Sequence, residues 1–166
     1  MGEILSTKVI CAYLNRHHLD CRWVDIRKNL ITDAVFREAA VDWDNSRKWV
    51  RKNFLYDQDK IIVKQGFIGG TYNRLSTTLG REGSDYTAAI LANILESEKV
   101  VIWKDVPGVM NADPRYFQYT SKLDRISFQE AIELAYYGAK ILHPKTIKPL
   151  QNKQIPLYVK SFMEPD

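Results

Sequence analysis

The chain has 166 residues, of which 45% are hydrophobic and 27% charged, and its formal net charge is +4. This composition favours one globular domain, which buries roughly two-thirds of its unfolded surface, over a disordered chain. The sequence has neither an apolar run near the ~20 residues of a membrane span nor the layout of a secretory signal. The basic residues are dispersed among 20 carboxylates, which favours a mixed solvated surface over a nucleic-acid or membrane interface. We therefore expect a soluble cytoplasmic protein.

Segments of helical and of strand periodicity alternate along the chain, which predicts an α/β fold. The capping-box pattern that begins at Ser127 and the proline at Pro144 are typical helix starts. In chain order, the predicted elements are a helix at 3–16, a strand at 21–26, a helix at 42–55 with Asp44 as its N-cap, a buried strand at 60–65, a helix at 84–95, a strand at 100–103, a helix at 127–137 that Gly138 ends, a helix from about Pro144, and a strand at 155–159.

A long loop rich in Gly and Thr is expected between the strand at 60–65 and the helix at 84–95. Glycines let the backbone approach a ligand, and the N-terminus of the following helix favours negative charge. Arg81 adds a planar guanidinium that suits a carboxylate. Ordinary tight turns need the same residues, and neither a P-loop nor a dinucleotide fingerprint is present. The loop alone therefore leaves both an anion site and a plain turn open.

Several blocks of the sequence together resemble the aspartokinase branch of the amino acid kinase family, in the family's order and spacing. With Gly2-Glu3 at the front they span nearly the whole chain. The blocks are Gln65-Gly66-Phe67-Ile68-Gly69, Thr77-Thr78-Leu79-Gly80-Arg81, Gly83-Ser84-Asp85-Tyr86-Thr87-Ala88-Ala89, Ile102-Trp103-Lys104-Asp105-Val106-Pro107-Gly108, Asp113-Pro114-Arg115 and Gly138-Ala139-Lys140-Ile141-Leu142-His143-Pro144. The resemblance implies the amino acid kinase (carbamate kinase-like) fold, a three-layer α/β sandwich with a mainly parallel sheet.

The resemblance also implies a reaction, in which the β-carboxylate of L-aspartate attacks the γ-phosphorus of ATP bound with Mg²⁺. Glu3 would meet the substrate ammonium group, while Arg81 and Ser84 would receive its α-carboxylate. Asp85 would lie beside the phosphates as the catalytic carboxylate that orients lysines there. The remaining implied site residues are Phe67 and Gly83 beside the substrate, and Lys104, Asp105, Met110, Arg115, Lys140 and Ile141 at the nucleotide. By its own pattern Asp113-Pro114-Arg115 is equally a plain turn.

Three positions depart from the family's usual pattern. Glu82 stands where a glycine is common, Lys104 replaces a frequent threonine, and Met110 replaces a frequent tyrosine. A carboxylate at Glu82 would repel an anionic substrate, so we expect this side chain to turn outward to solvent. Met110 still offers adenine a soft apolar face.

The family's first strand and loop, of the form Lys-Phe-Gly-Gly-Thr-Ser, is not found in the chain, and its regulatory ACT domains would begin beyond Asp166. We therefore expect residues 1–166 to form a partial catalytic domain that is inactive or nearly so by itself and self-associates as a homo-oligomer. Two alternatives stay open: a nucleotide-binding module without transfer activity, and a kinase of the same superfamily that acts on N-acetylglutamate or on a nucleotide.

The remaining thiol and imidazole groups carry weaker signals. Cys11 and Cys21 are expected as reduced thiols, and a structural disulfide is the less favoured alternative. His17, His18 and Cys21 lack the spacing of a zinc site, so a solvated helix end is expected there and no metal site is predicted. His143, which precedes Pro144, is expected to fix a turn.

Overall fold

The computed structural model describes residues 2–54, 61–113, 116–137 and 142–164. The chain divides into two compact units at residues 1–87 and 88–166. The first unit contains α1 (Gly2–Arg16), β1 (Cys21–Val24), the short 3₁₀ turn η1 (Ile26–Lys28), α2 (Trp43–Asn53), β2 (Ile61–Lys64), β3 (Ile68–Gly70) and β4 (Ser76–Thr78). Helix α3 (Gly83–Leu95) begins in the first unit and continues into the second, which adds β5 (Val100–Lys104), α4 (Phe128–Tyr136), α5 (Pro144–Gln151) and β6 (Leu157–Ser161).

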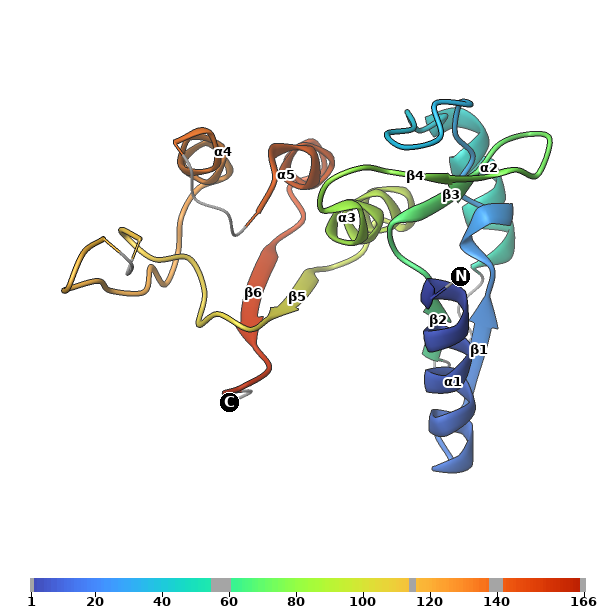
Figure 1. Cartoon of the computed structure of the whole chain (residues 1–166), viewed down its shortest axis with the longest axis horizontal. Coiled ribbons are helices and arrows are strands. Elements are labelled where there is room, and N and C mark those ends of the chain that lie inside the picture. Colours follow the sequence, from blue (N-terminus) through green and yellow to red (C-terminus); the bar gives the residue numbers. More distant parts are fainter. Residues whose placement is uncertain (1, 55–60, 114–115, 138–141, 165–166) are drawn as a thin grey trace. The chain divides into compact units, whose positions relative to one another are not determined.

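In the first unit β1 and β2 pair in parallel, with Cys21 opposite Ile61. Helix α1 runs alongside both strands (Figure 1). Trp23 on β1 donates a hydrogen bond from Nε1 to Thr7 Oγ1 at 3.0 Å, and Cys11 is the buried residue of the helix. The apolar stripe that predicted this helix does not face the unit, since the side chains of Leu5 and Val9 are 67% and 60% exposed. The helix was predicted correctly, but its covered face is the mixed one that carries Thr7, Cys11 and Leu14.

The loop predicted between the β2 strand and α3 is in fact partly a sheet. β3 and β4 form an antiparallel hairpin in which Ile68 lies opposite Thr78 and Gly70 opposite Ser76. Gly70 also donates to the Leu30 carbonyl at 3.0 Å, and a Cβ added there would collide with the Arg27 carbonyl oxygen. Each strand has only three residues, too few to show an alternating pattern, and Gly69 and Gly70 have low strand propensity, so the sequence pattern missed them.

The second unit is held together by an aliphatic core. β5 and β6 pair in parallel, with Ile102 opposite Val159. Strand β6 begins two residues later than predicted, because Ile155 N–H still donates to the Leu150 carbonyl at 3.0 Å and Pro156 has no N–H for a ladder bond. The buried cluster behind these strands consists of Ala89, Ala92, Val100, Ile102, Leu142, Ile147, Leu150 and Ile155.

Of three helix ends predicted from the sequence, one is confirmed, one is wrong and one lies outside the described residues. Ser127 caps α4 in a reciprocal capping box with Glu130, as expected. The N-cap of α2 is Asp42, not Asp44, because Asp42 Oδ1 accepts the N–H of Asn45 at 3.1 Å. The predicted stop at Gly138 lies outside the described residues.

Two strand predictions also need correction. The strand predicted over 21–26 ends at Val24, since Asp25 caps the 3₁₀ turn that follows. The strand predicted as buried, β2, is only partly covered, and Ile61 at its start is 40% exposed. Both differences arise from neighbours that local periodicity does not reveal.

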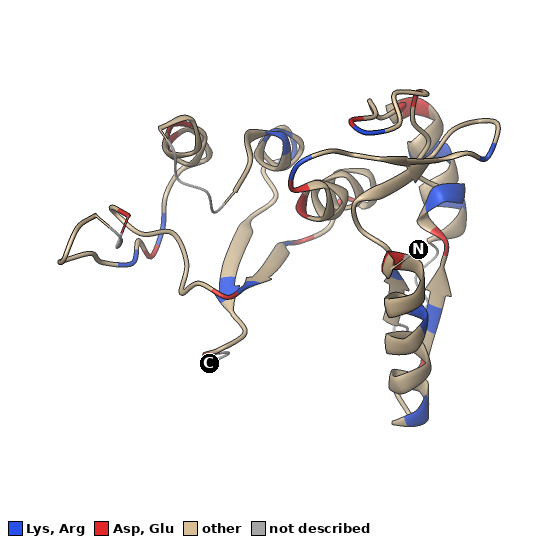
Figure 2. Ribbon diagram, in the orientation of Figure 1, with Lys and Arg blue, Asp and Glu red and all other residues tan. Residues whose placement is uncertain are grey.

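Charges are interspersed along the ribbon of each unit and do not gather in one block (Figure 2). This agrees with the mixed surface expected from the dispersed Lys, Arg, Asp and Glu of the sequence. Of the helices in the described part of the chain, none has the length and apolar character that crossing a membrane demands.

Candidate active site

Backbone hydrogen bonds tie the loop after β2 to the first turn of α3. Phe67 N–H donates to Thr87 Oγ1 at 3.1 Å, and the Phe67 carbonyl accepts from Leu79 N–H at 2.8 Å. The same Thr87 hydroxyl donates to the Gly83 carbonyl at 2.7 Å and is fully buried. One threonine therefore fixes both the loop and the start of the helix, because its hydroxyl acts as donor and acceptor at once.

Two glycines allow this loop and helix to touch. A Cβ added at Gly66 would lie 2.9 Å from the Cα of Ser84, and one added at Gly83 would lie 2.9 Å from Cδ2 of Phe67. Larger residues at either position would push the helix start away from the loop. Phe67, Gly83 and Ser84, three of the predicted substrate residues, are therefore brought into direct contact.

The N-terminus of α3 makes the surroundings of this contact favourable for negative charge. The unpaired amides of a helix's first turn and the helix dipole favour an anion. Arg81, just before the helix, and Ser84, in its first turn, are both exposed, and Asp85 beside them is half-buried. A guanidinium and a hydroxyl that are open to solvent, at the positive end of a helix dipole, can together hold a small carboxylate.

Strained backbone is found on both sides of this contact. Phe67 has φ 69° and Glu82 has φ 53°, both in the left-handed region that non-glycine residues rarely adopt. Such conformations tend to persist at functional sites, where the surrounding structure enforces them.

The outward orientation expected for Glu82 is wrong for one of its carboxylate oxygens. Its Oε2 is buried without a hydrogen-bond partner, and the residue as a whole is half-buried. Glu82 lies in the tight turn closed by the hydrogen bond from Gly83 N–H to the Gly80 carbonyl, at 3.1 Å, where protein covers part of its side chain. The family's usual glycine would have no carboxylate to bury there and no strain at this φ.

The predicted ammonium contact, Glu3, lies in the first turn of α1 and is half-buried. One turn later, Thr7 Oγ1 accepts from Gln65 Nε2 at 3.0 Å. Gln65 is itself fully buried, and its Oε1 accepts the N–H of Ile26 at 3.0 Å. Because Gln65 directly precedes Gly66, these bonds tie the first turns of α1 to the start of the site loop.

In the second unit, Lys104 ends β5 and Asp105 follows it, so both lie at the carboxyl end of the strand as predicted. The Lys104 carbonyl accepts from Phe162 N–H at 3.0 Å, while Asp105 is exposed. Met110 is half-buried and forms an antiparallel bridge with Lys122. The other predicted nucleotide residues, Arg115, Lys140 and Ile141, lie outside the described residues.

Sequence reasoning missed Lys64 as a candidate site residue. It ends β2 immediately before Gln65 and Gly66, and burial lowers the pKa of its ammonium to about 8. The available signal was a lysine that closes the apolar run Ile61-Ile62-Val63, where neighbouring elements can cover much of the side chain.

The imidazole groups take structural or exposed positions. His143 caps α5, with its Nδ1 accepting from Lys145 N–H at 3.1 Å, which confirms its predicted turn role. His17 and His18 are exposed, whereas Cys21 is buried. Within residues 2–54, 61–113, 116–137 and 142–164, no three His, Cys, Asp or Glu side chains converge as metal ligands.

Comparison with known proteins matches this chain to relatives over almost its full length. The E. coli (strain K12) lysine-sensitive aspartokinase 3 is 39% identical over 165 residues, which are 99% of this chain and 37% of that protein. A chloroplastic bifunctional aspartokinase/homoserine dehydrogenase 1 of Arabidopsis thaliana is 38% identical over 162 residues, which are 97% of this chain but 18% of the relative. The chain thus spans well under half the length of these relatives.

Solved structures agree with the sequence matches. E. coli aspartokinase III in complex with aspartate and ADP superposes with a TM-score of 0.92 at 39% identity, over 99% of this chain and 37% of that one. A UMP kinase from Ureaplasma parvum, at 21% identity and a TM-score of 0.66, covers 99% of this chain and 61% of its own and shares the fold alone. The family model described as "Amino acid kinase family" matches residues 1–161. The chain therefore belongs to the amino acid kinase family, whose α/β fold with parallel strands it shares.

Proposed function

We propose that the protein to which this chain belongs transfers the γ-phosphoryl group of ATP to the side-chain carboxylate of L-aspartate, the first step of lysine and threonine biosynthesis. The observation that carries the proposal is the likeness, over 99% of the chain, to an aspartokinase that holds aspartate and ADP. The contact between the loop at Phe67 and the first turn of α3 supports it, because it forms an anion-binding corner beside a strand end.

In this proposal the exposed side chains of Arg81 and Ser84 hold the α-carboxylate of aspartate at the start of α3. Glu3, one turn before the Thr7 hydroxyl that Gln65 contacts, meets the ammonium group, so both ends of the zwitterion find opposite charge. Phe67 and Gly83 flank the substrate. Asp85, in the first turn of α3, orients positively charged groups around the phosphoryl that moves.

We assign the nucleotide to the predicted residues at the end of β5, namely Lys104, Asp105 and Met110, together with Arg115, Lys140 and Ile141. Since no three metal-binding side chains converge in the described part of the chain, Mg²⁺ would be held mainly by phosphates and water.

The chemistry needs no general base, since the attacking β-carboxylate is already an anion at neutral pH. Its oxygen forms a bond to the γ-phosphorus while the bond to the bridging oxygen of ADP breaks, and the products are aspartyl phosphate and ADP. Positioning and charge neutralisation then supply most of the rate, as in other phosphoryl transfers.

A chimera tests the proposal directly. In it, residues 1–166 replace the matching segment of E. coli aspartokinase 3, and ADP release is measured with aspartate, N-acetylglutamate and UMP as acceptors. Turnover is expected with aspartate as acceptor and with neither of the other two acceptors. A folded chimera that binds ATP by calorimetry yet transfers to no acceptor would favour the non-catalytic nucleotide-binding module. Turnover with N-acetylglutamate or UMP would instead favour another kinase of the superfamily.

Arg81→Ala in the active chimera tests the assigned carboxylate contact. Losing a charge-assisted bidentate hydrogen bond costs about 1.5–3 kcal/mol, so KM for aspartate should rise roughly tenfold or more while KM for ATP changes little. Arg81→Lys is the matched control. Its KM for aspartate should lie between those of the unsubstituted chimera and Arg81→Ala, because lysine keeps the charge but not the two parallel donors of the guanidinium. Equal effects on both substrates would remove Arg81 from the aspartate site.

Two further parts of the prediction stay predictions. Homo-oligomeric assembly is one, and cytoplasmic location is the other, because several relatives are chloroplastic by name. Sedimentation of the purified chain would test the first of these.

A further inference from the structure

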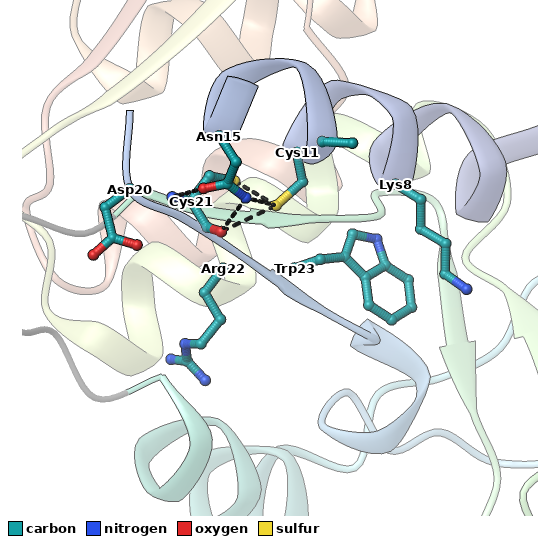
Figure 3. A pocket seen from close by; sticks show the side chains of 8 residues that line it. Lys8, Cys11, Asn15, Asp20, Cys21, Arg22 and Trp23 are labelled. Atoms are coloured by element: carbon teal, nitrogen blue, oxygen red, sulfur yellow. Dashed lines mark hydrogen bonds between the residues drawn. The ribbon is translucent and has the colours of Figure 1, made fainter. Parts of the chain in front are cut away.

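Two cysteines from different elements meet in the first unit. The Sγ atoms of Cys11 on α1 and Cys21 on β1 are 2.6 Å apart, and both residues are free and buried (Figure 3). A disulfide bond measures ~2.0 Å between sulfurs, so bond formation requires only a small approach of the two side chains.

The backbone around the pair is held independently of any bond between the sulfurs. Asn15 on α1 donates from Nδ2 to the Cys21 carbonyl at 2.8 Å, and its Oδ1 accepts Cys21 N–H at 2.9 Å. The Cys11 thiol donates to the same carbonyl at 3.3 Å. This clamp keeps the two thiols aimed at each other in the reduced protein.

A cavity of about 620 Å³ opens beside the pair (Figure 3). Besides the two cysteines, its lining includes the cationic side chains of Lys8 and Arg22 and the ring of Trp23, over which Lys8 Nζ lies at 4.9 Å. Asp20 contributes one carboxylate. The Lys8 ammonium beside this aromatic ring suits a small peptide disulfide that carries carboxylates, such as glutathione disulfide, whereas the Arg22 guanidinium donates to the Asn53 carbonyl at 3.0 Å.

We propose that Cys11 and Cys21 form a dithiol modification site that small anionic disulfides oxidise to an intramolecular disulfide. One cysteine thiolate attacks the small disulfide, expelling one small thiolate and leaving a mixed disulfide on the protein. The second cysteine loses its proton to solvent and attacks the protein sulfur of that mixed disulfide, expelling the second small thiol. Two protein thiols are thereby oxidised as one small disulfide is reduced to two thiols.

The Cys21 thiol is protonated at neutral pH. Burial and the adjacent Cys11 thiol raise the pKa of Cys21 to about 11, so this group carries its proton at neutral pH and exchanges slowly. Oxidation would tie α1 to β1, and this consequence does not depend on the kinase function proposed above.

The test equilibrates the purified 166-residue chain with glutathione buffers running from fully reduced to fully oxidised. In the oxidised protein the intact mass should fall by two hydrogen atoms, both free thiols should disappear, and a peptide linking Cys11 to Cys21 should be found. Since the closed loop is short, melting should occur roughly 5–10 °C higher than in the reduced form.

The single variants Cys11→Ser and Cys21→Ser are the matched controls, and each should stop at one glutathione adduct. Wild-type protein that keeps two titratable thiols under full oxidation, carries two adducts, or links only between chains would overturn the proposal. Because the decisive measurements use the wild-type chain, misfolding of a variant cannot obscure them.

Discussion

Both units of the chain bury aliphatic side chains, such as Ile26, Leu30 and Val50 in the first, but the first unit also buries many polar ones. In the first unit, buried polar side chains connect one element to the next, and they include Asn29, Thr32, Ser46, Gln65, Thr71, Thr77 and Thr87. In the second, aliphatic side chains from α3, β5 and α5 pack into one cluster, with Ile147 and Leu150 fully buried. Hydrogen bonds are directional and fix backbone, whereas apolar packing fixes whole elements and leaves their connections free.

This difference bears on the site. The loop at Phe67 is anchored by the Thr87 hydroxyl, so the aspartate half of the proposed site is preformed. The loop after β5 is positioned at its start by Lys104, but the side chains of Tyr116 and Tyr119 are 79% and 89% exposed. We expect substitutions in the aliphatic cluster and substitutions of the hydrogen-bonding side chains to have effects of different size and kind.

Ile147→Ala should have the largest effect, because it removes a fully buried side chain from the aliphatic cluster. A loss of about 2–5 kcal/mol in the free energy of unfolding is expected, measured by urea denaturation with hydrogen exchange resolved by peptide. Val101→Ala, on the exposed side of β5, is the control and should cost far less. Similar losses for both would mean that this core does not hold the second unit.

Lys64→Met should come next, and its effect should depend on pH. Burial lowers the folded pKa to about 8 from an ordinary 10.5, so the folded state binds fewer protons between these values and stability rises with pH there. Below pH 8 the cost of burying the charge is fully present. The variant should therefore be more stable at pH 7 by up to about 3 kcal/mol, with the gain gone above pH 10.5.

Lys99→Met, at an exposed position, is the control. Its gain in the free energy of unfolding should differ little between pH 7 and pH 11. A Lys64→Met gain that is equal at pH 7 and pH 11 would mean that packing, and not the buried charge, is responsible.

Thr87→Val tests the polar anchor of the site loop. It leaves the Phe67 amide without its acceptor and should cost about 1–3 kcal/mol, with faster hydrogen exchange at that amide. Thr78→Val is the matched control, because its hydroxyl bonds to the Phe36 and Arg37 carbonyls are exposed and water replaces them. Unchanged exchange at Phe67 in Thr87→Val would show that the loop is held by something else.

Glu82→Gly should have the smallest effect and the opposite sign. It relieves a left-handed φ of 53° and removes a buried carboxylate oxygen that has no partner, so a gain of about 1 kcal/mol is expected. Glu96→Gly shares the backbone relief at φ 55° but has an exposed carboxylate paired with Lys153. Thermal melts that show an equal gain for both would assign the Glu82 effect to backbone alone.

Much of the fold could be predicted from local pattern. The capping box at Ser127 marked the start of α4, and helical apolar spacing located α3 to within one residue. The motif resemblance named residues at 67, 83 and 84 that the structure does bring into contact. The predictions that failed depend on a distant neighbour, such as the orientation of Glu82 or the face that α1 buries.

By itself the sequence determined the alternation of helices and strands, their caps, and membership of a family, because these are written in short-range spacing and in the order of motifs. Only the tertiary structure decided that Gly66 meets Ser84, that β3 and β4 pair, that Lys64 leaves water, and that Cys11 faces Cys21. The physical reason is that contact, burial and pKa belong to pairs of groups brought together by packing, and no local pattern specifies the second member of such a pair.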